Sequence, residues 1–404
     1  MAFSKADKGI RDRKDLFIRL LTIVLSAVYI LIMHAAVSKN VKVFDVEGAY
    51  AVKAEVSEMA ELVTDVYEAG SSYETASQYF YAKVLSGSQK GEPVVAVQTI
   101  DNYSAFQEET VKPGDKVILY NYDDPEGDAG FIFGGYERLD LNIVLGCVFF
   151  ALLLLFGRLK GFHTIVALVF TCLAVFYVFV PAVLAGYNVY VMTCLTCVFT
   201  IIMTLLITNG ACGKSLTTIL GCCFGVLVAA LLTVLFSKLM RLTGILDEHS
   251  VYLQYLSSGV EIDLRALIFG MIVIGALGAV MDVAMDISSS LSEVHLQAPH
   301  LRFSELFRSG IRIGRDVMGT MANTLVLAYI GSNLCGILLL ITYSSSMLEL
   351  LNRESIAVEL LQAIIGSLAI LLTIPLTSLV CAALYTGKPG NTAVYTGKHS
   401  TREG

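Results

Sequence analysis

Two aspartates in an otherwise apolar stretch are the residues best placed to do chemistry. Asp282 and Asp286 are four residues apart, so on a helix they lie one above the other on a single face. A carboxylate at the centre of a bilayer costs about 2.5–3.5 kcal/mol on the translocon scale. Two stacked carboxylates also repel each other unless a cation, a proton or an arginine neutralises them. If the stretch begins near Leu264, Asp282 lies about one helical turn inside the cytoplasmic boundary, which marks a candidate intramembrane site.

A second set of polar residues recurs at helical spacing in the next apolar stretch. Spacings of three and four residues place most of them on one stripe of a helix. In neighbouring antiparallel helices, this stripe would lie at the same depth as the two aspartates. We therefore expect one buried polar cluster that also contains Arg315, Asp316, Thr320, Asn323 and Thr324.

Three interpretations of this cluster stay open. It could be a cation or proton site within a transport path, the default hypothesis for ionisable residues inside a membrane. Alternatively, Arg315 neutralises the aspartates and the cluster only locks helices together. In the third interpretation, paired carboxylates perform acid–base or aspartyl-protease-like chemistry in a membrane enzyme. Because the sequence contains neither an HExxH zinc motif nor a GxSxG elbow, we assign no catalytic residue, no cofactor and no metal site.

Long apolar stretches must position these residues. Only 16% of the 404 residues are charged, whereas soluble domains carry about 25%, and the mean hydropathy is +0.70. A helix needs roughly 20 apolar residues to cross a bilayer. We therefore predict an all-α polytopic membrane bundle, in which Gly275, Gly278 and Gly319 let neighbouring helices approach closely. The eight predicted transmembrane helices are 16–37, 139–156, 162–184, 187–208, 215–237, 264–286, 317–342 and 357–384.

The basic residues predict how the chain is oriented. Five of them precede the first transmembrane helix, 16–37, so residues 1–15 are expected in the cytoplasm. Residues 139–385 would form a seven-helix membrane domain, and the polar segment 386–404 would be a disordered cytoplasmic tail. Within the membrane domain, residues 295–313 are expected to form an interfacial helix whose apolar side chains face lipid. The net charge of −7 offers no basic surface for nucleic acid, so membrane lipid is the expected partner.

Residues 38–138 have a different character and are predicted to form a small extracytoplasmic β-rich domain. A possible helix at 52–69 is followed by short runs of β-branched and aromatic residues at 80–85, 94–100 and 116–122. Turn residues separate these runs, and the segment contains no cysteine, so no disulfide framework supports it. The pattern suggests a small barrel or sandwich, and an OB-like barrel is one candidate.

Two long runs resemble a known family. Residues 275–285 and 309–329 are similar to the YibE/F-like family of bacterial multi-pass membrane proteins, and the likeness covers nearly the whole chain. At 333–336 the sequence departs from the Leu/Pro-rich continuation usual in that family. The resemblance implies a bacterial plasma-membrane protein with a paired homologous subunit or a homo-oligomer as partner, but no substrate. The residues that match the family pattern are Asp282, Arg315, Asp316, Gly319, Thr320, Asn323 and Thr324.

Two functions are consistent with these features. The first is a secondary transporter or exporter driven by an ion gradient, since no ATP-binding motif is present. The second is a non-transporting assembly or sensory protein whose polar cluster is structural. An enzymatic role is neither assigned nor required.

Overall fold

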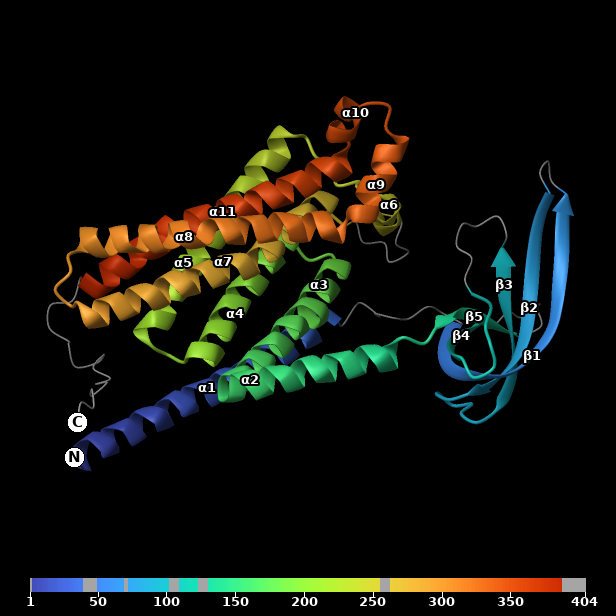
Figure 1. The fold of residues 1–404 in the computed structure, drawn as a ribbon, viewed down its shortest axis with the longest axis horizontal. Coiled ribbons are helices and arrows are strands. Elements are labelled where there is room, and N and C mark those ends of the chain that lie inside the picture. Colours follow the sequence, from blue (N-terminus) through green and yellow to red (C-terminus); the bar gives the residue numbers. More distant parts are fainter. Residues whose placement is uncertain are drawn as a thin grey trace. The chain divides into compact units, whose positions relative to one another are not determined.

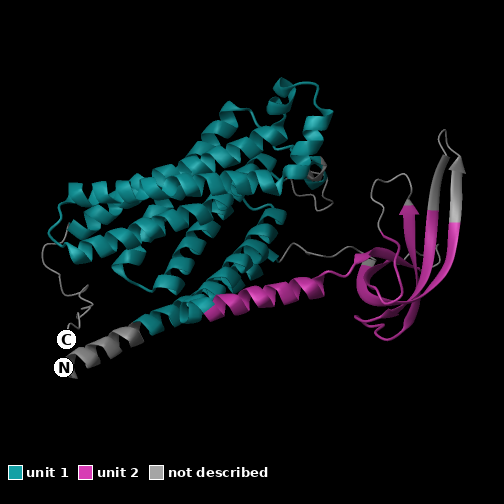
Figure 2. Cartoon of the chain, viewed as in Figure 1, with its two compact units in different colours: residues 1–41, 156–404 teal, residues 42–155 magenta. Residues whose placement is uncertain are grey.

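The computed structural model describes residues 2–38, 49–68, 72–101, 109–122, 130–254 and 262–386. Two compact units divide the chain, one containing Met1–Val41 and Phe156–Gly404 and the other containing Lys42–Leu155 (Figure 2). The first unit is helical, and the second combines a small β-barrel with the first part of a long helix. A mostly helical chain with a small β region was predicted from the sequence, and this part of the prediction is confirmed.

The helices follow one another along most of the chain (Figure 1). Within the residues that the structure describes, six helices are long and apolar enough to cross a membrane, and the bent pair α8–α9 would make a seventh crossing. The predicted number of eight is therefore not confirmed. The helices are α1 Ala2–Val37, α2 Leu139–Leu173, the π-helix η2 Ala174–Phe179, α3 Val180–Leu184, α4 Val189–Asn209, α5 Gly213–Leu239, α6 Glu248–Gln254, α7 Leu264–Gln297, α8 Phe303–Ser332, α9 Leu334–Tyr343, α10 Met347–Asn352 and α11 Glu354–Thr386.

The segment between α7 and α8 differs from the prediction. The expected interfacial helix at 295–313 is absent, because α7 continues to Gln297 and α8 begins at Phe303. The side chain of Glu305 accepts a hydrogen bond from the backbone N–H of Arg302 and so caps the first turn of α8. Leu306 is fully buried in the helix core, so the apolar side of this turn packs on neighbouring helices and does not face lipid.

Small residues let α5, α7 and α11 approach closely in the centre of the helical unit. A Cβ atom placed on Gly225 of α5 would overlap Thr373 Oγ1 of α11 and lie 2.7 Å from Val280 Cγ1 of α7. Gly221, one turn earlier, faces Thr377 in the same way. The buried side chains around this contact form the largest apolar core of the unit. Close backbone approach through glycine and threonine is typical of helices packed within a membrane.

The second unit contains a closed five-stranded barrel with the strand order β1-β2-β3-β5-β4. Strands β3 and β5 are parallel, and the other neighbouring pairs are antiparallel. The interior is apolar, with Phe80 and Leu119 fully buried. The strands are β1 Ala49–Glu68, β2 Ser72–Val84, β3 Pro93–Asp101, β4 Lys116–Tyr122 and β5 Phe131–Tyr136.

The predicted helix at 52–69 is wrong, because this segment is strand β1. Alternate residues Val52, Ala54 and Val56 are buried, which is the two-residue period of a strand. Pairing with both β2 and β4 overrides the helix-forming alanines and glutamates of the segment. The three predicted runs overlap β2, β3 and β4, whereas the sequence analysis missed β5.

An ion-pair cluster connects strand β1 to the start of α2 within the second unit. Lys53 Nζ donates to Glu137 Oε1 and to Asp140 Oδ1, each at 2.9 Å. The hydrogen bond from Lys53 holds the pKa of Glu137 below its usual value. Only 3% of the Glu137 side chain is exposed, so this ion pair anchors the barrel to the first turn of α2.

Residues 387–404, nearly all of the predicted tail, lie outside the described residues.

Candidate intramembrane site on α7 and α8

The packing of α7 against α8 sets the relative depth of the predicted site residues. Gly310 of α8 contacts Leu291 of α7, and nearer the far end Tyr329 contacts Gly275. The two helices are therefore antiparallel neighbours. This register places Asp282 about level with residues 319–322 and Asp286 about level with residues 315–318. The polar residues of the two helices thus lie at matching depths.

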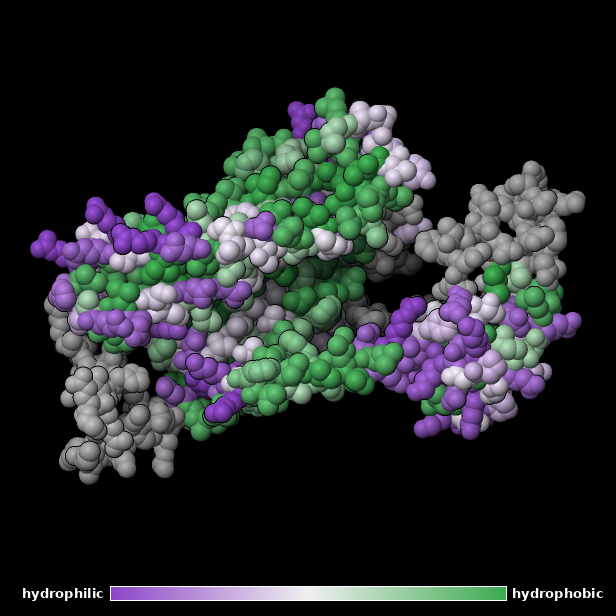
Figure 3. Space-filling model, viewed as in Figure 1, coloured by the Kyte–Doolittle hydropathy of each residue, from purple (hydrophilic) through white to green (hydrophobic). Residues whose placement is uncertain are grey.

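All seven polar residues of the predicted cluster are exposed at the surface of the chain. They are Asp282, Asp286, Arg315, Asp316, Thr320, Asn323 and Thr324. We call this surface the α7–α8 face. The expectation that the cluster is buried is wrong for the single chain, while its role in binding stays a prediction. Figure 3 shows hydrophilic side chains gathered at the end of the helical unit where α8 begins and α7 ends.

The opposite side of α8 explains why its polar stripe is exposed. Gly310 and Gly314 are buried, and their missing side chains make room for Ser378 and Ile374 of α11. Only this small-residue side of α8 can approach α11 closely. The stripe on the other side must therefore turn outward.

The functional groups on the α7–α8 face are not bonded to one another. Thr320 Oγ1 donates to Val317 O at 2.9 Å, and Thr324 Oγ1 donates to Thr320 O at 2.8 Å, so both hydroxyls bond to their own helix. Among the described residues, no ion pair links Arg315 to an aspartate and no hydrogen bond crosses between the two polar stripes. The carboxylates and the guanidinium remain available to a ligand, to water or to another subunit.

The three glycines predicted to mediate helix packing behave differently. A Cβ atom on Gly275 would lie 2.8 Å from Tyr329 Oη and 3.1 Å from Gln362 Nε2, so this glycine is a close contact within the chain. At Gly278 and Gly319, no described atom lies within 4 Å of such a Cβ. Packing at these two positions would need a partner from outside the described chain.

A second polar group lies where α8 ends; the sequence drew attention to the segment 333–336 but not to its polar partners on α11. Asn333 separates α8 from α9, and the two helices are bent by 64°. Asn333 Nδ2 donates to Glu359 Oε1 of α11 at 3.2 Å. About one turn further along α11, the Gln362 amide lies beside Gly275 together with Tyr329. The available signal was a glutamate and a glutamine three residues apart within the apolar stretch 357–384.

Comparison with known proteins identifies the family of the helical part of the chain. A model of the YibE/F-like protein family matches residues 145–387, more than half of the chain. The chain belongs to the YibE/F-like family. No curated protein and no solved structure matches it. The match begins within α2 and continues through α11, so the family pattern lies in the helices that carry the α7–α8 face. Together with the apolar helices, it indicates a membrane protein.

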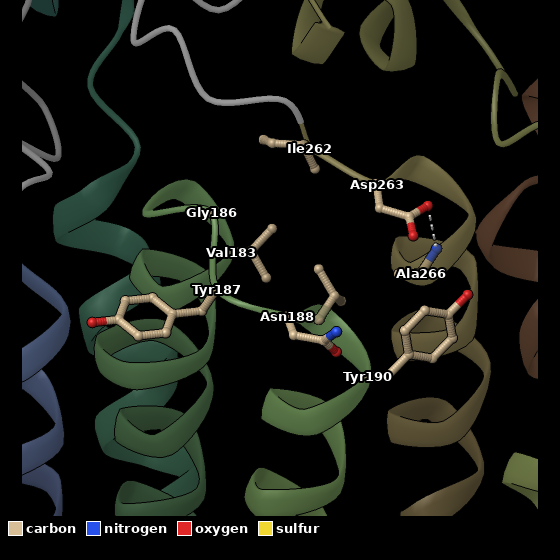
Figure 4. A pocket seen from close by; sticks show the side chains of 9 residues that line it. Val183, Gly186, Tyr187, Asn188, Tyr190, Ile262, Asp263 and Ala266 are labelled. Atoms are coloured by element: carbon tan, nitrogen blue, oxygen red, sulfur yellow. Dashed lines mark hydrogen bonds between the residues drawn. The ribbon is translucent and has the colours of Figure 1, made fainter.

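This YibE/F-like chain also has a small pocket of about 110 Å³ where α3 ends and α4 and α7 begin (Figure 4). Two of the polar side chains there cap helices. Asn188 Oδ1 accepts from Val191 N of α4, and Asp263 Oδ1 accepts from Arg265 N and Ala266 N of α7. Asp263 precedes Asp282 by about 28 Å along the helix axis. The pocket is therefore separate from the α7–α8 face.

Proposed function

We propose that this YibE/F-like protein is a secondary transporter of the cell membrane whose solute path follows the α7–α8 face. One observation carries the proposal. Charged and amide side chains are exposed, without bonds to one another, on helices that can cross a membrane. Contact of such groups with lipid tails would cost several kcal/mol for each charge. Water, a solute or another subunit must therefore cover this face.

The charges of the face favour a positively charged solute or coupling ion. Three carboxylates, on Asp282, Asp286 and Asp316, accompany a single guanidinium, on Arg315. Carboxylate, amide and hydroxyl oxygens are donors that suit hard cations. An ion gradient could thus drive transport through direct binding at these groups.

Eight membrane crossings fit the helix lengths, and an even number would leave both termini on one side, for which the basic residues before the first crossing favour the cytoplasm. The segment Leu139–Leu184 has 46 residues, a length of about 69 Å if straight, whereas the hydrocarbon core is about 30 Å thick. Its backbone is non-helical at Arg158, with φ 49° and ψ −127°, so two crossings that meet near Arg158 are the better fit. With α8–α9 as one crossing, the total becomes eight. The closed five-stranded barrel supports the OB-like assignment of an outer domain that contacts the solute or a partner.

The alternative is a non-transporting assembly or sensory protein. The open space at Gly278 and Gly319 favours it, because small exposed residues let a helix of a homologous subunit or a second copy approach closely. In that case the α7–α8 face is a subunit interface.

Ion flux into proteoliposomes tests the proposed transport. The purified full chain is reconstituted, and uptake of protons and of radioactive Na⁺ is measured under an imposed gradient. Asp282→Asn keeps the shape of the side chain and removes its charge, so it should abolish flux while the folded yield stays normal. Glu293→Gln is the matched control, since Glu293 is an exposed carboxylate about three turns further along the same helix. Normal flux through Asp282→Asn would eliminate the proposed path.

A further inference from the structure

We infer that Glu359 and Asn333 form a second binding site on this path, for a monovalent cation, at the break between α8 and α9. A proton and Na⁺ share the required chemistry, which is a single positive charge on a carboxylate. The inference rests on the proposed transport function, because this site would lie at the opposite end of the same solute path from Asp282 and Asp286. Its test nevertheless measures binding and not flux.

The break in the helix supplies oxygen atoms. Asn333 has non-helical angles, φ −117° and ψ 24°, and α9 leaves at 64° to α8. The last carbonyl groups of a helix lack their regular partners within that helix. They also carry the negative end of the helix dipole. Here the Tyr329 carbonyl accepts from Asn333 N and Ser332 Oγ. The Asn333 carbonyl accepts from Ile337 N of α9, which leaves it a lone pair for a cation. A broken transmembrane helix thus presents carbonyl oxygens to a cation at the depth where it ends.

The amide of Asn333 is held in place from both sides. Its Nδ2 donates to Glu359 Oε1 at 3.2 Å. Its Oδ1 occupies the space in which a side chain on Gly336 would have to lie. A larger residue at position 336 would push this amide aside, so Gly336 leaves it the room to turn toward α11. The helix break and Gly336 together allow the Asn333 amide to lie beside the Glu359 carboxylate.

The charge of Glu359 has no counterion among the described residues. The nearest charged side chains along the chain already have partners. Arg353 Nη2 donates to Glu349 Oε1 at 2.9 Å, and Glu354 accepts hydrogen bonds from Thr243 and Gly244. Of the titratable groups on α8, Tyr329 lies nearest, one turn from Asn333. A half-buried carboxylate in an apolar helix needs a cation or a proton to neutralise it.

Polar groups connect this site to the α7–α8 face. The Tyr329 hydroxyl is buried beside Gln362 and lacks a well-formed hydrogen bond among the described residues. Both side chains lie against Gly275, which shares one face of α7 with Asp282. From Gly275 to Asp286 the distance along the helix is about 16 Å. Together with Glu359, these groups extend over most of a hydrocarbon core of about 30 Å.

The test is a thermal-unfolding titration of the purified full chain in detergent. The midpoint is measured with increasing NaCl, with choline chloride keeping the ionic strength constant, and separately over a range of pH. A ligand that binds only the folded state raises the midpoint. We expect the midpoint to rise with Na⁺, or with falling pH alone if the ligand is a proton, and Glu359→Gln to lose this dependence. If the ligand is Na⁺, Asn333→Ala should weaken the apparent affinity about tenfold, because the amide oxygen is lost as a ligand. If the ligand is a proton, Asn333→Ala should instead strengthen binding, because the Asn333 N–H stabilises the ionised form of Glu359.

The controls keep the outcomes distinct. Glu293→Gln should retain the full dependence, because its carboxylate lies at the other end of α7. If Glu359→Gln fails to fold, labelling of Glu359 by a hydrophobic carbodiimide is followed by mass spectrometry on the unsubstituted chain, where Na⁺ or high pH should protect it. The same dependence in Glu359→Gln, no dependence in the unsubstituted chain, or unprotected labelling would each overturn the inference. Loss of flux with an intact, Glu359-dependent midpoint shift would instead refute transport and leave the binding site standing.

Discussion

Substitution of Gly225 by alanine gives the sharpest test of how the helices pack. A Cβ atom at this position would overlap Thr373 Oγ1 and lie 2.7 Å from Val280 Cγ1. Thr373 and Val280 are both 0% exposed, and Thr373 Oγ1 is fixed by a 2.7 Å hydrogen bond to Ala369 O, so neither can move aside. Overpacking of a core costs about 1–3 kcal/mol, while alanine gains about 1 kcal/mol over glycine in helix propensity. We expect a net loss of up to about 2 kcal/mol in the free energy of unfolding, toward the upper end because both neighbours are fixed.

Thermal unfolding of the detergent-solubilised chain measures this loss. Gly278→Ala is the matched control, since nothing lies within 4 Å of its added methyl group and its stability should be unchanged or higher. Adding Thr373→Ala to Gly225→Ala removes the overlapping hydroxyl and should recover part of the loss, which a double-mutant cycle reports as a coupling between the two sites. If Gly225→Ala unfolds at the same temperature as Gly278→Ala, the close approach of α5 and α11 is wrong.

Two further predictions concern the surface. Gly319→Cys should give a cross-linked dimer with a short bis-maleimide in membranes, beyond any background from the nine native cysteines. The control Leu231→Cys, at a 62% exposed position of α5, should not. Equal cross-linking of the two variants would argue against a second copy on the α7–α8 face. Hydrogen bonds from Ser345, followed by one from Arg353, lower the pKa of Glu349 from 4.5 to about 2. Because the folded pKa is depressed, the contribution of Glu349 to the stability of α10 is complete above about pH 4.5 and is lost as the pH falls toward 2. Hydrogen exchange of α10 should therefore differ between the unsubstituted chain and Glu349→Gln at pH 6 but converge near pH 2, and a difference that persists at low pH would contradict this assignment.

The sequence was sufficient for the features that depend on local pattern. Long apolar runs predicted the membrane helices, and the four-residue spacing of Asp282 and Asp286 placed both on one face of α7, although that face proved to be exposed and not buried. Strand β1 was misread because its alanines and glutamates favour a helix, while its pairing partners lie up to about 70 residues away in β4. Non-local pairing of this kind cannot be inferred from propensity.

The sequence also could not predict that the polar stripe of α8 faces outward. An amphipathic helix in a membrane protein is normally expected to turn its charged side inward. Here the glycine side of α8, with Gly310 and Gly314, fits against Ser378 and Ile374, and this contact decides the rotation of the helix. Similarly, the contact between Asn333 and Glu359 depends on a helix break and on the register of α8 against α11. Each of these results from the packing of two helices together.

The charges of the α7–α8 face connect the two proposed functions. Lipid tails cannot cover exposed carboxylates, so another subunit, water or a solute must do so. If a second copy covers this face, the carboxylates of Asp282, Asp286 and Asp316 from both copies meet only two guanidinium groups. Such an excess of like charge in a dry interface would be strongly repulsive. The two copies can therefore associate here only if water or cations remain between them, which is also the condition that the proposed transport path requires.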